Sequence, residues 1–363
     1  MKYVWQVGLI LWLSVVGMAA PLEERVEQAV LAHTSGTWQI LEILSKDEMD
    51  VKDRFKELKP HIQNGIIQQA VILDAKEDKI PTLYRLLLKD NKVTALKTQL
   101  SPNKSMEQTI TLAFNQLTDG NSLRTGIFIS AHGNGNRMLY QDKALTVKYI
   151  LQQAQRKNLN IEVLELDACN MGNLLSATDI ANYKGRVHYF LGASSLMCGN
   201  FIIPNPSFAA YLPDAKTALK KVLQVRLEQF SKWGFSYTNN LFVVDMPQVN
   251  LPLRAWVESF KRLKQQQPKL ATKLIGFESK SLEDPNWYSL TELLKWQIAQ
   301  TEQETGFANR TKQLLNALDN ALVEQWCYSK PQNKVFKDKY ISPQSGCLNG
   351  FATSKEYIEK VLK

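Results

Sequence analysis

The apolar residues of this chain fall into two kinds of segment, short continuous runs and longer stretches with helical spacing. Short runs bounded by polar or turn residues are typical of buried strands, whereas apolar positions three and four residues apart are typical of amphipathic helices. The runs predict strands at residues 37–44, 70–73, 92–100, 125–130, 161–166, 187–193 and 241–245. Helical spacing predicts helices between them at 22–33, 47–62, 106–117, 146–156 and 173–183. Strands that alternate with helices in this way form a mostly parallel sheet covered on both faces.

The pattern changes after Pro204, where helical spacing dominates. Helices are expected at 215–233, 251–265, 270–277, 289–300 and 309–326. The apolar run at 241–245 interrupts this part of the chain, and we expect it to join the sheet. We therefore predict an α/β fold with a core domain over residues 20–248 and a helical C-terminal region over 249–363 that packs on the core.

Residues 1–19 have the layout of a secretory signal peptide. A short positive region is followed by an apolar stretch at 3–16 and by small residues that end at Ala19,. Cleavage after Ala19 is favoured, because a cut one residue later would leave Pro21 next to the cleaved bond. The alternative is an uncleaved anchor helix, but the apolar stretch falls short of the ~20 residues that span a bilayer. We expect an exported bacterial protein, periplasmic or secreted, with no membrane segment after signal removal.

Composition and charge indicate a folded globular protein with a basic surface. The 363 residues are 44% hydrophobic and 22% charged, with a formal net charge of +9. A chain of this size buries a substantial core. Lysine and arginine are scattered rather than gathered with aromatic residues into a patch, which argues against nucleic acid as a partner. We expect the protein to be a monomer.

The four cysteines are too few for a disulfide scaffold in a chain of this length,. In an oxidising compartment Cys327 and Cys347 are candidates for a disulfide that staples the C-terminal region. Cys198 has no obvious partner. An exported protein that keeps an unpaired cysteine usually has a chemical reason to keep it, which directs attention to Cys169.

Two predicted strands run directly into residues that carry chemistry. The strand at 125–130 leads into Ala-His-Gly-Asn-Gly at 131–135, and the strand at 161–166 leads into Asp-Ala-Cys-Asn-Met-Gly at 167–172. In a parallel sheet both carboxyl ends lie on the same edge, where α/β folds hold their ligands. A thiol there becomes a nucleophile if an imidazole takes its proton and backbone N–H groups stabilise the oxyanion.

These two motifs resemble those of the clostripain-like cysteine peptidases, relatives of caspases, legumains and gingipains. The resemblance runs from about residue 38 to the C-terminus and implies a caspase-like fold for the core. It implies that Cys169 is the nucleophile and that His132 is the base that later protonates the leaving amine. It also implies that the backbone N–H groups of Gly133 and Cys169 form the oxyanion hole, and that the partner is a peptide or protein substrate.

The resemblance further implies a preference for basic residues at the cleavage site. In the family, an acidic residue two positions before the cysteine lines the pocket for Arg or Lys, and Asp167 holds that position here. A carboxylate at the base of a pocket favours a guanidinium and disfavours an uncharged side chain, which leaves the carboxylate unpaired. The loop at 194–198 follows a strand and corresponds to one that shapes the pocket, so Ser194 and Ser195 are candidate substrate-binding residues. Family members often carry acids in this loop and a glutamate after the cysteine motif, and this chain carries neither.

We expect no cofactor and no metal site. The sequence contains no H-E-x-x-H, no P-loop and no G-x-G-x-x-G after a strand,. Calcium dependence is known in the family, but no calcium-binding motif supports it here. His33, His61 and His188 have no motif around them, and we interpret them as structural or surface residues.

Other interpretations of the motif residues stay open. Cys169 alone would more often be a small buried hydrophobic residue, and His132 alone could stabilise a turn. Asp167 could cap the helix that follows the cysteine. At the level of function, the alternatives are a non-catalytic relative that binds peptides or an envelope protein, and an acyl transferase that uses the same thioester.

Overall fold

The structure is a computed structural model of the chain. It describes residues 38–45, 51–76, 79–120, 122–135, 138–140, 143–194, 214–233, 239–277, 287–301, 305–329, 334–336, 348 and 350–363. The predicted signal peptide and the predicted helix at 22–33 lie outside these residues. The chain from Thr37 to Lys363 forms one compact unit. The domain boundary after residue 248 stays a prediction.

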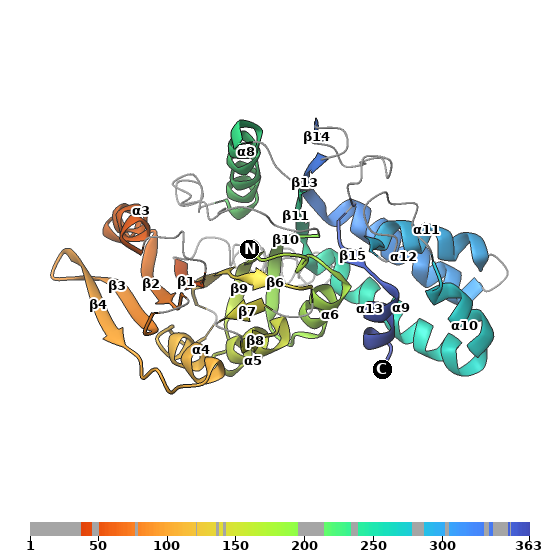
Figure 1. Cartoon of the computed structure of the whole chain (residues 1–363), viewed down its shortest axis with the longest axis horizontal. Helices are drawn as coiled ribbons and strands as arrows, with labels where there is room; N and C mark the ends of the chain where they lie inside the picture. The colour runs from red at the N-terminus through yellow and green to blue at the C-terminus, as the bar shows by residue number, and fades with distance from the viewer. Residues whose placement is uncertain are drawn as a thin grey trace, which may run out of the picture. The chain divides into compact units, whose positions relative to one another are not determined.

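Ten of the described strands form one sheet, in the order β14-β13-β11-β10-β9-β5-β1-β2-β3-β4 (Figure 1). Neighbouring strands from β10 to β2 are all parallel. They are β10 (Arg186–Ala193), β9 (Asn160–Asp167), β5 (Arg124–Ser130), β1 (Trp38–Leu44) and β2 (Ile67–Asp74). The apolar runs of the sequence predict each of these five strands. Both faces of each strand are covered, which explains why its apolar residues form a continuous run and do not alternate with polar ones.

Antiparallel strands extend the parallel centre on both sides. β3 (Thr82–Lys89) and β4 (Lys92–Gln99) form a hairpin next to β2. On the other side β11 (Asn239–Asp245) pairs with β10, which confirms that the run at 241–245 joins the sheet, and β13 (Leu322–Ser329) and β14 (Lys334–Phe336) follow.

The helix predicted at 309–326 is wrong at its C-terminal end. α12 (Thr305–Ala321) ends earlier, and the next residues form β13. Leu322 and Trp326 are four residues apart, which fits a helix, but both are buried in a strand that pairs with β11. Tertiary pairing overrides the local pattern here.

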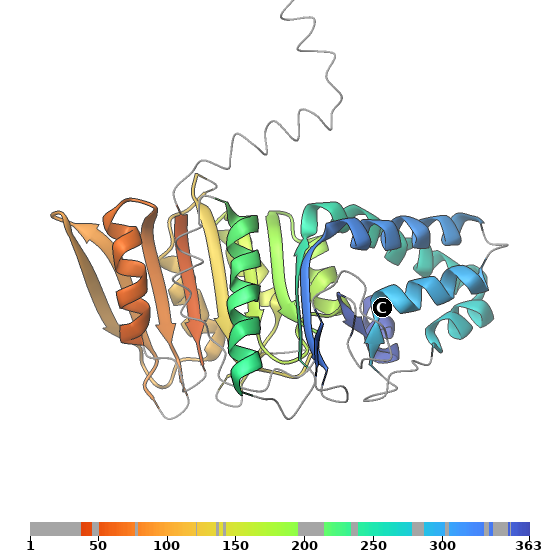
Figure 2. The same ribbon diagram turned by 90° about the horizontal axis from the view of Figure 1, so that it is seen from above.

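Helices cover both faces of the sheet. One face packs against α4 (Met106–Asn115), α5 (Val147–Arg156), α6 (Leu174–Asn182) and α9 (Met246–Gln266). The other face packs against α3 (Val51–Gln63) and α8 (Ala215–Trp233), which lie in front of the sheet in Figure 2. This mixed sheet, parallel at its centre and covered by helices on both faces, confirms the predicted α/β class.

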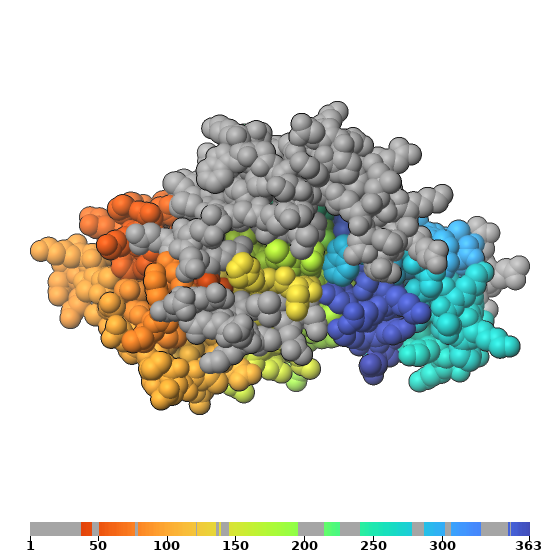
Figure 3. All heavy atoms as spheres, in the orientation of Figure 1, coloured from red at the N-terminus to blue at the C-terminus, as the bar shows by residue number. Residues whose placement is uncertain are grey.

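The C-terminal part adds a group of helices beside the sheet and then returns to it. α10 (Pro268–Ile275), α11 (Leu290–Gln300) and α12 pack with α9. The last described segment forms β15 (Ala352–Thr353), paired with β12 (Tyr288–Ser289), and α13 (Lys355–Val361). In Figure 3 this segment is dark blue and lies next to the yellow residues that follow β5.

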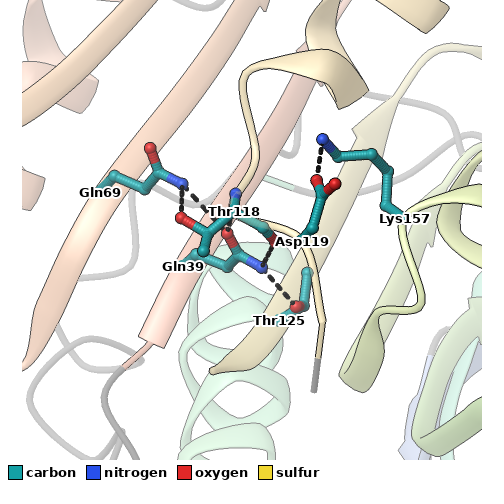
Figure 4. Close-up of polar contacts among 6 residues, drawn as sticks. All are labelled: Gln39, Gln69, Thr118, Asp119, Thr125 and Lys157. Atoms are coloured by element: carbon teal, nitrogen blue, oxygen red, sulfur yellow. Dashed lines mark hydrogen bonds and ion pairs between the residues drawn. The ribbon is translucent and has the colours of Figure 1, made fainter. Parts of the chain in front are cut away.

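The amino ends of three parallel strands are joined by a buried amide network (Figure 4). The Gln39 side-chain oxygen accepts from the Thr118 N–H at 3.0 Å and from Gln69 Nε2 at 3.1 Å. Gln39 Nε2 donates to the Thr118 carbonyl at 3.2 Å and to Thr125 Oγ1 at 3.1 Å. Each of these polar groups therefore has a partner within the protein, so we interpret the network as structural. It lies at the sheet edge opposite to the two sequence motifs.

We expect Gln39→Leu to lower the free energy of unfolding by about 3 kcal/mol, because it leaves several buried donors and acceptors without a partner. Urea denaturation followed by tryptophan fluorescence measures the change. Gln68→Leu is the matched control, because Gln68 is exposed on the neighbouring strand. Equal stability of the two variants would show that the network contributes little.

Candidate active site

The two sequence motifs lie side by side at the carboxyl edge of the sheet. β5 and β9 are adjacent and parallel, with Ser130 opposite Asp167 in the register. The Ala131 N–H donates to the Asp167 carbonyl at 3.2 Å. We call residues 131–135 the His loop and residues 168–172 the Cys turn. The fold thus brings together two segments that are far apart in the sequence.

The backbone of the His loop packs directly on the backbone of the Cys turn. A Cβ atom placed on Gly133 would lie 2.5 Å from the Cys169 carbonyl oxygen and 2.8 Å from the Cys169 nitrogen. Real Cβ atoms do not approach backbone atoms so closely, so only glycine fits here. This contact places His132, the residue before Gly133, next to the turn that carries Cys169.

The two candidate catalytic side chains differ in exposure. His132 is exposed and belongs to β6 (His132–Gly133), which pairs with β7 (Met138–Tyr140); β7 in turn pairs with β8 (Lys143–Leu145). Cys169 is half-buried, is a thiol rather than half of a disulfide, and lies against the apolar cluster on the face of α3 and α8. The two residues therefore belong to touching segments, with His132 on the exposed His loop and Cys169 in the half-buried Cys turn.

Asn173 links the His loop, the Cys turn and helix α6 through a single fully buried side chain. Its Nδ2 donates to the Asn170 carbonyl and to the Gly135 carbonyl, each at 2.5 Å. Its Oδ1 accepts from the N–H groups of Leu175 and Ser176 and so caps α6. The alternative in which Asp167 caps this helix is therefore wrong. An asparagine directly before an apolar helical stretch was the available signal for this cap, and the prediction missed it.

Asp167 is buried at the end of β9, and its Oδ2 accepts from Ser130 Oγ at 3.2 Å. It lies two residues before Cys169, at the same sheet edge. Ser194 follows β10 at this edge too, but it is fully buried, and its Oγ accepts from Asn240 Nδ2 at 2.5 Å. Ser195 lies outside the described residues.

The remaining candidate residues lie elsewhere. Cys327 is disulfide-bonded, while Cys347 lies outside the described residues, so their pairing stays a prediction. Burial lowers the pKa of His61 and of His188 and favours their neutral forms. The described residues contain no group of three or more His, Cys, Asp or Glu suited to a metal ion. In the same part of the chain, no helix has the length and apolar character needed to cross a membrane.

Comparison with known proteins identifies the fold. No family model and no curated protein matches the sequence, but solved structures do. An inactive zymogen C11 protease from Parabacteroides distasonis superposes with a TM-score of 0.58 at 11% identity, over 90% of this chain and 94% of that one. The chain has the fold of the C11 cysteine proteases.

A second organism provides further examples of the C11 fold. A secreted C11 cysteine protease from Bacteroides thetaiotaomicron, iotapain, has a TM-score of 0.55 at 13% identity, over 86% of this chain and 93% of that one. A secreted C11 protease from the same organism, in complex with an irreversible peptide inhibitor, has a TM-score of 0.53 at 15% identity, over 88% and 92% of the two chains. The likeness covers nearly the whole of each chain and confirms the predicted caspase-like architecture.

Proposed function

We propose that this protein is an exported cysteine endopeptidase that uses Cys169 as nucleophile and His132 as general base. The observation that carries the proposal is the contact between Gly133 and the Cys169 backbone, at the carboxyl edge of a C11 fold. It puts a thiol and an imidazole on touching segments, as nucleophilic catalysis requires. The secreted proteases with this fold and the apolar segment at 3–16 support an exported location.

The reaction follows from the two side chains. His132 takes the Cys169 Sγ proton, and the thiolate attacks the peptide carbonyl carbon to form a tetrahedral oxyanion. The N–H groups of Gly133 and Cys169 are the proposed donors to this oxyanion. The imidazolium then protonates the leaving amine as the C–N bond breaks, which leaves a thioester. Water attacks the thioester with His132 as base, and the acid product and the free thiol are released.

We also propose that the enzyme cleaves after arginine or lysine, with Asp167 as the acid that recognises the basic side chain. Its buried carboxylate lies two residues from the nucleophile at the same sheet edge. A buried carboxylate is stabilised by a guanidinium or an ammonium and is left uncompensated by an apolar side chain.

For Asp167→Asn we expect about a 100-fold loss of kcat/KM on arginine substrates and only a few-fold loss on uncharged ones, because the charge pair is lost. Initial rates on matched fluorogenic peptides measure both. Ser130→Ala is the control, since it removes the hydrogen bond to Asp167 but keeps the carboxylate. Equal losses on all peptides, with a lower melting temperature, would assign Asp167 a structural role instead.

The experiment that tests the function uses the mature protein under reducing conditions. It is incubated with fluorogenic arginine, lysine and uncharged peptides, with calcium and with a chelator. Site-resolved mass spectrometry follows labelling of Cys169 by an arginyl chloromethyl ketone. Turnover together with labelling supports the proposal. If neither turnover nor labelling is seen, the peptidase proposal is wrong and the alternative of a peptide-binding relative remains. Amide products formed with added amines would indicate acyl transfer.

A further inference from the structure

The C-terminal segment at 350–363 contacts the Cys turn directly. The Ala352 N–H donates to the Gly172 carbonyl at 3.0 Å, and Ala352 forms a parallel bridge with Asn173. Phe351 anchors the segment on the sheet, since its buried ring stacks on Phe190 at 5.6 Å and meets Phe242 edge-on at 5.0 Å. The segment is thus fixed beside the Cys turn by both backbone and core contacts.

The same segment contacts the His loop through Tyr357 of α13. Tyr357 Oη donates to the Asn134 carbonyl at 3.3 Å. A Cβ atom on Gly135 would overlap that hydroxyl, so the loop and the phenol are in direct contact. Burial raises the pKa of Tyr357 to about 12, and the hydroxyl therefore remains a hydrogen-bond donor at neutral pH.

Tyr357 is itself held in position by Trp287. Its ring packs edge-on against Trp287, with centroids 5.1 Å apart. Trp287 Nε1 donates to the Ser194 carbonyl at 2.7 Å, at the end of β10. Tyr357 is buried and lies one turn after Ser354, the N-cap residue of α13. A rigid phenol on a capped helix gives the His loop a fixed point of attachment.

The His loop depends on contacts with other segments to keep its position. It leaves the sheet after β5, and two of its residues, His132 and Asn134, are exposed. Its contact with the Cys turn at Gly133 sets where the imidazole lies relative to the thiol. A displacement of about 1 Å in a catalytic group costs up to about 100-fold in rate.

We propose that Tyr357 is a positioning residue that holds the His loop against the Cys turn and so sets His132 beside Cys169. This inference rests on the proposed function. The C-terminal segment is then part of the catalytic apparatus although it supplies no reacting group. Figure 3 shows the segment beside the residues that follow β5.

The test is Tyr357→Phe, which keeps the ring packing on Trp287 and removes only the donor. The matched control is Tyr183→Phe, because Tyr183 Oη donates to the Leu159 carbonyl at 3.2 Å, a similar bond in another part of the fold. We expect kcat to fall about 3- to 10-fold in Tyr357→Phe with KM unchanged, the loss that one neutral hydrogen bond implies. Hydrogen exchange of the peptide that covers 131–135 should be faster in Tyr357→Phe and unchanged in the control.

Three outcomes overturn the proposal in distinguishable ways. If wild type is active and Tyr357→Phe matches Tyr183→Phe in kcat and exchange, the positioning role fails and the proposed function stands. If exchange is faster but kcat is unchanged, the hydroxyl holds the loop without positioning the catalytic pair. If wild type hydrolyses no peptide, the proposed function fails and the positioning role fails with it.

Discussion

Cys169→Ala is expected to lower kcat/KM on arginine peptides by about 10⁴-fold or more, because the variant has no group that can form the thioester. Alanine removes the sulfur of a half-buried side chain without adding volume, so the fold should be retained. Circular dichroism and thermal unfolding check the fold, and progress curves at high enzyme concentration measure the residual rate. A variant that keeps more than a tenth of the wild-type activity would exclude Cys169 as nucleophile.

His132→Ala tests whether the His132 imidazole acts together with the Cys169 thiol. If the imidazole activates the thiol, this variant should lose a similar factor, and the double variant should be little worse than either single one, because the two groups act as a unit. His61→Ala is the control, since His61 belongs to α3 and its pKa is lowered by burial rather than by any group of the site. Additive losses in the double variant would contradict a shared mechanism.

The sequence predicted the sheet edge where the site lies because strand ends and motif coincide there. An apolar run buried on both faces is recognisable locally, and each of two runs ends in a chemically distinctive motif. The rule that parallel strands end at one edge predicts that the two motifs share that edge, and the structure shows β5 and β9 as neighbours, with the His loop touching the Cys turn. The centre of the fold and the shared edge of the two motifs therefore followed from local pattern and one general rule, whereas the catalytic roles of His132 and Cys169 stay a prediction.

What the sequence could not predict depends on contacts between distant residues. The bond from Tyr357 to Asn134 joins positions 223 residues apart, and neither residue has a local signature. β13 continues the apolar spacing of α12 and becomes a strand because it pairs with β11 and β14. In both cases the deciding interaction lies outside any sequence window.

Gly133→Ala should lower kcat about 100-fold, because the added Cβ forces the His loop and the Cys turn apart by about 1 Å. The atoms it would meet are the Cys169 carbonyl oxygen at 2.5 Å and the Cys169 nitrogen at 2.8 Å. Both belong to the backbone, and the Asn173 amide ties the same turn to Gly135 and to α6. The turn cannot yield as a flexible side chain would, so the loop must move and carry the imidazole with it.

Gly306→Ala provides the matched control for this substitution. Nothing lies within 4 Å of a Cβ atom at Gly306, which is exposed in helix α12. Alanine there should leave activity unchanged and stability equal or slightly higher, because it is the better helix former. Steady-state kinetics and thermal unfolding of both variants separate a local effect on the site from a general loss of fold. Wild-type kcat in Gly133→Ala would mean that the contact between the two segments does not set the geometry of the catalytic pair, and the strongest structural support for the peptidase would be lost.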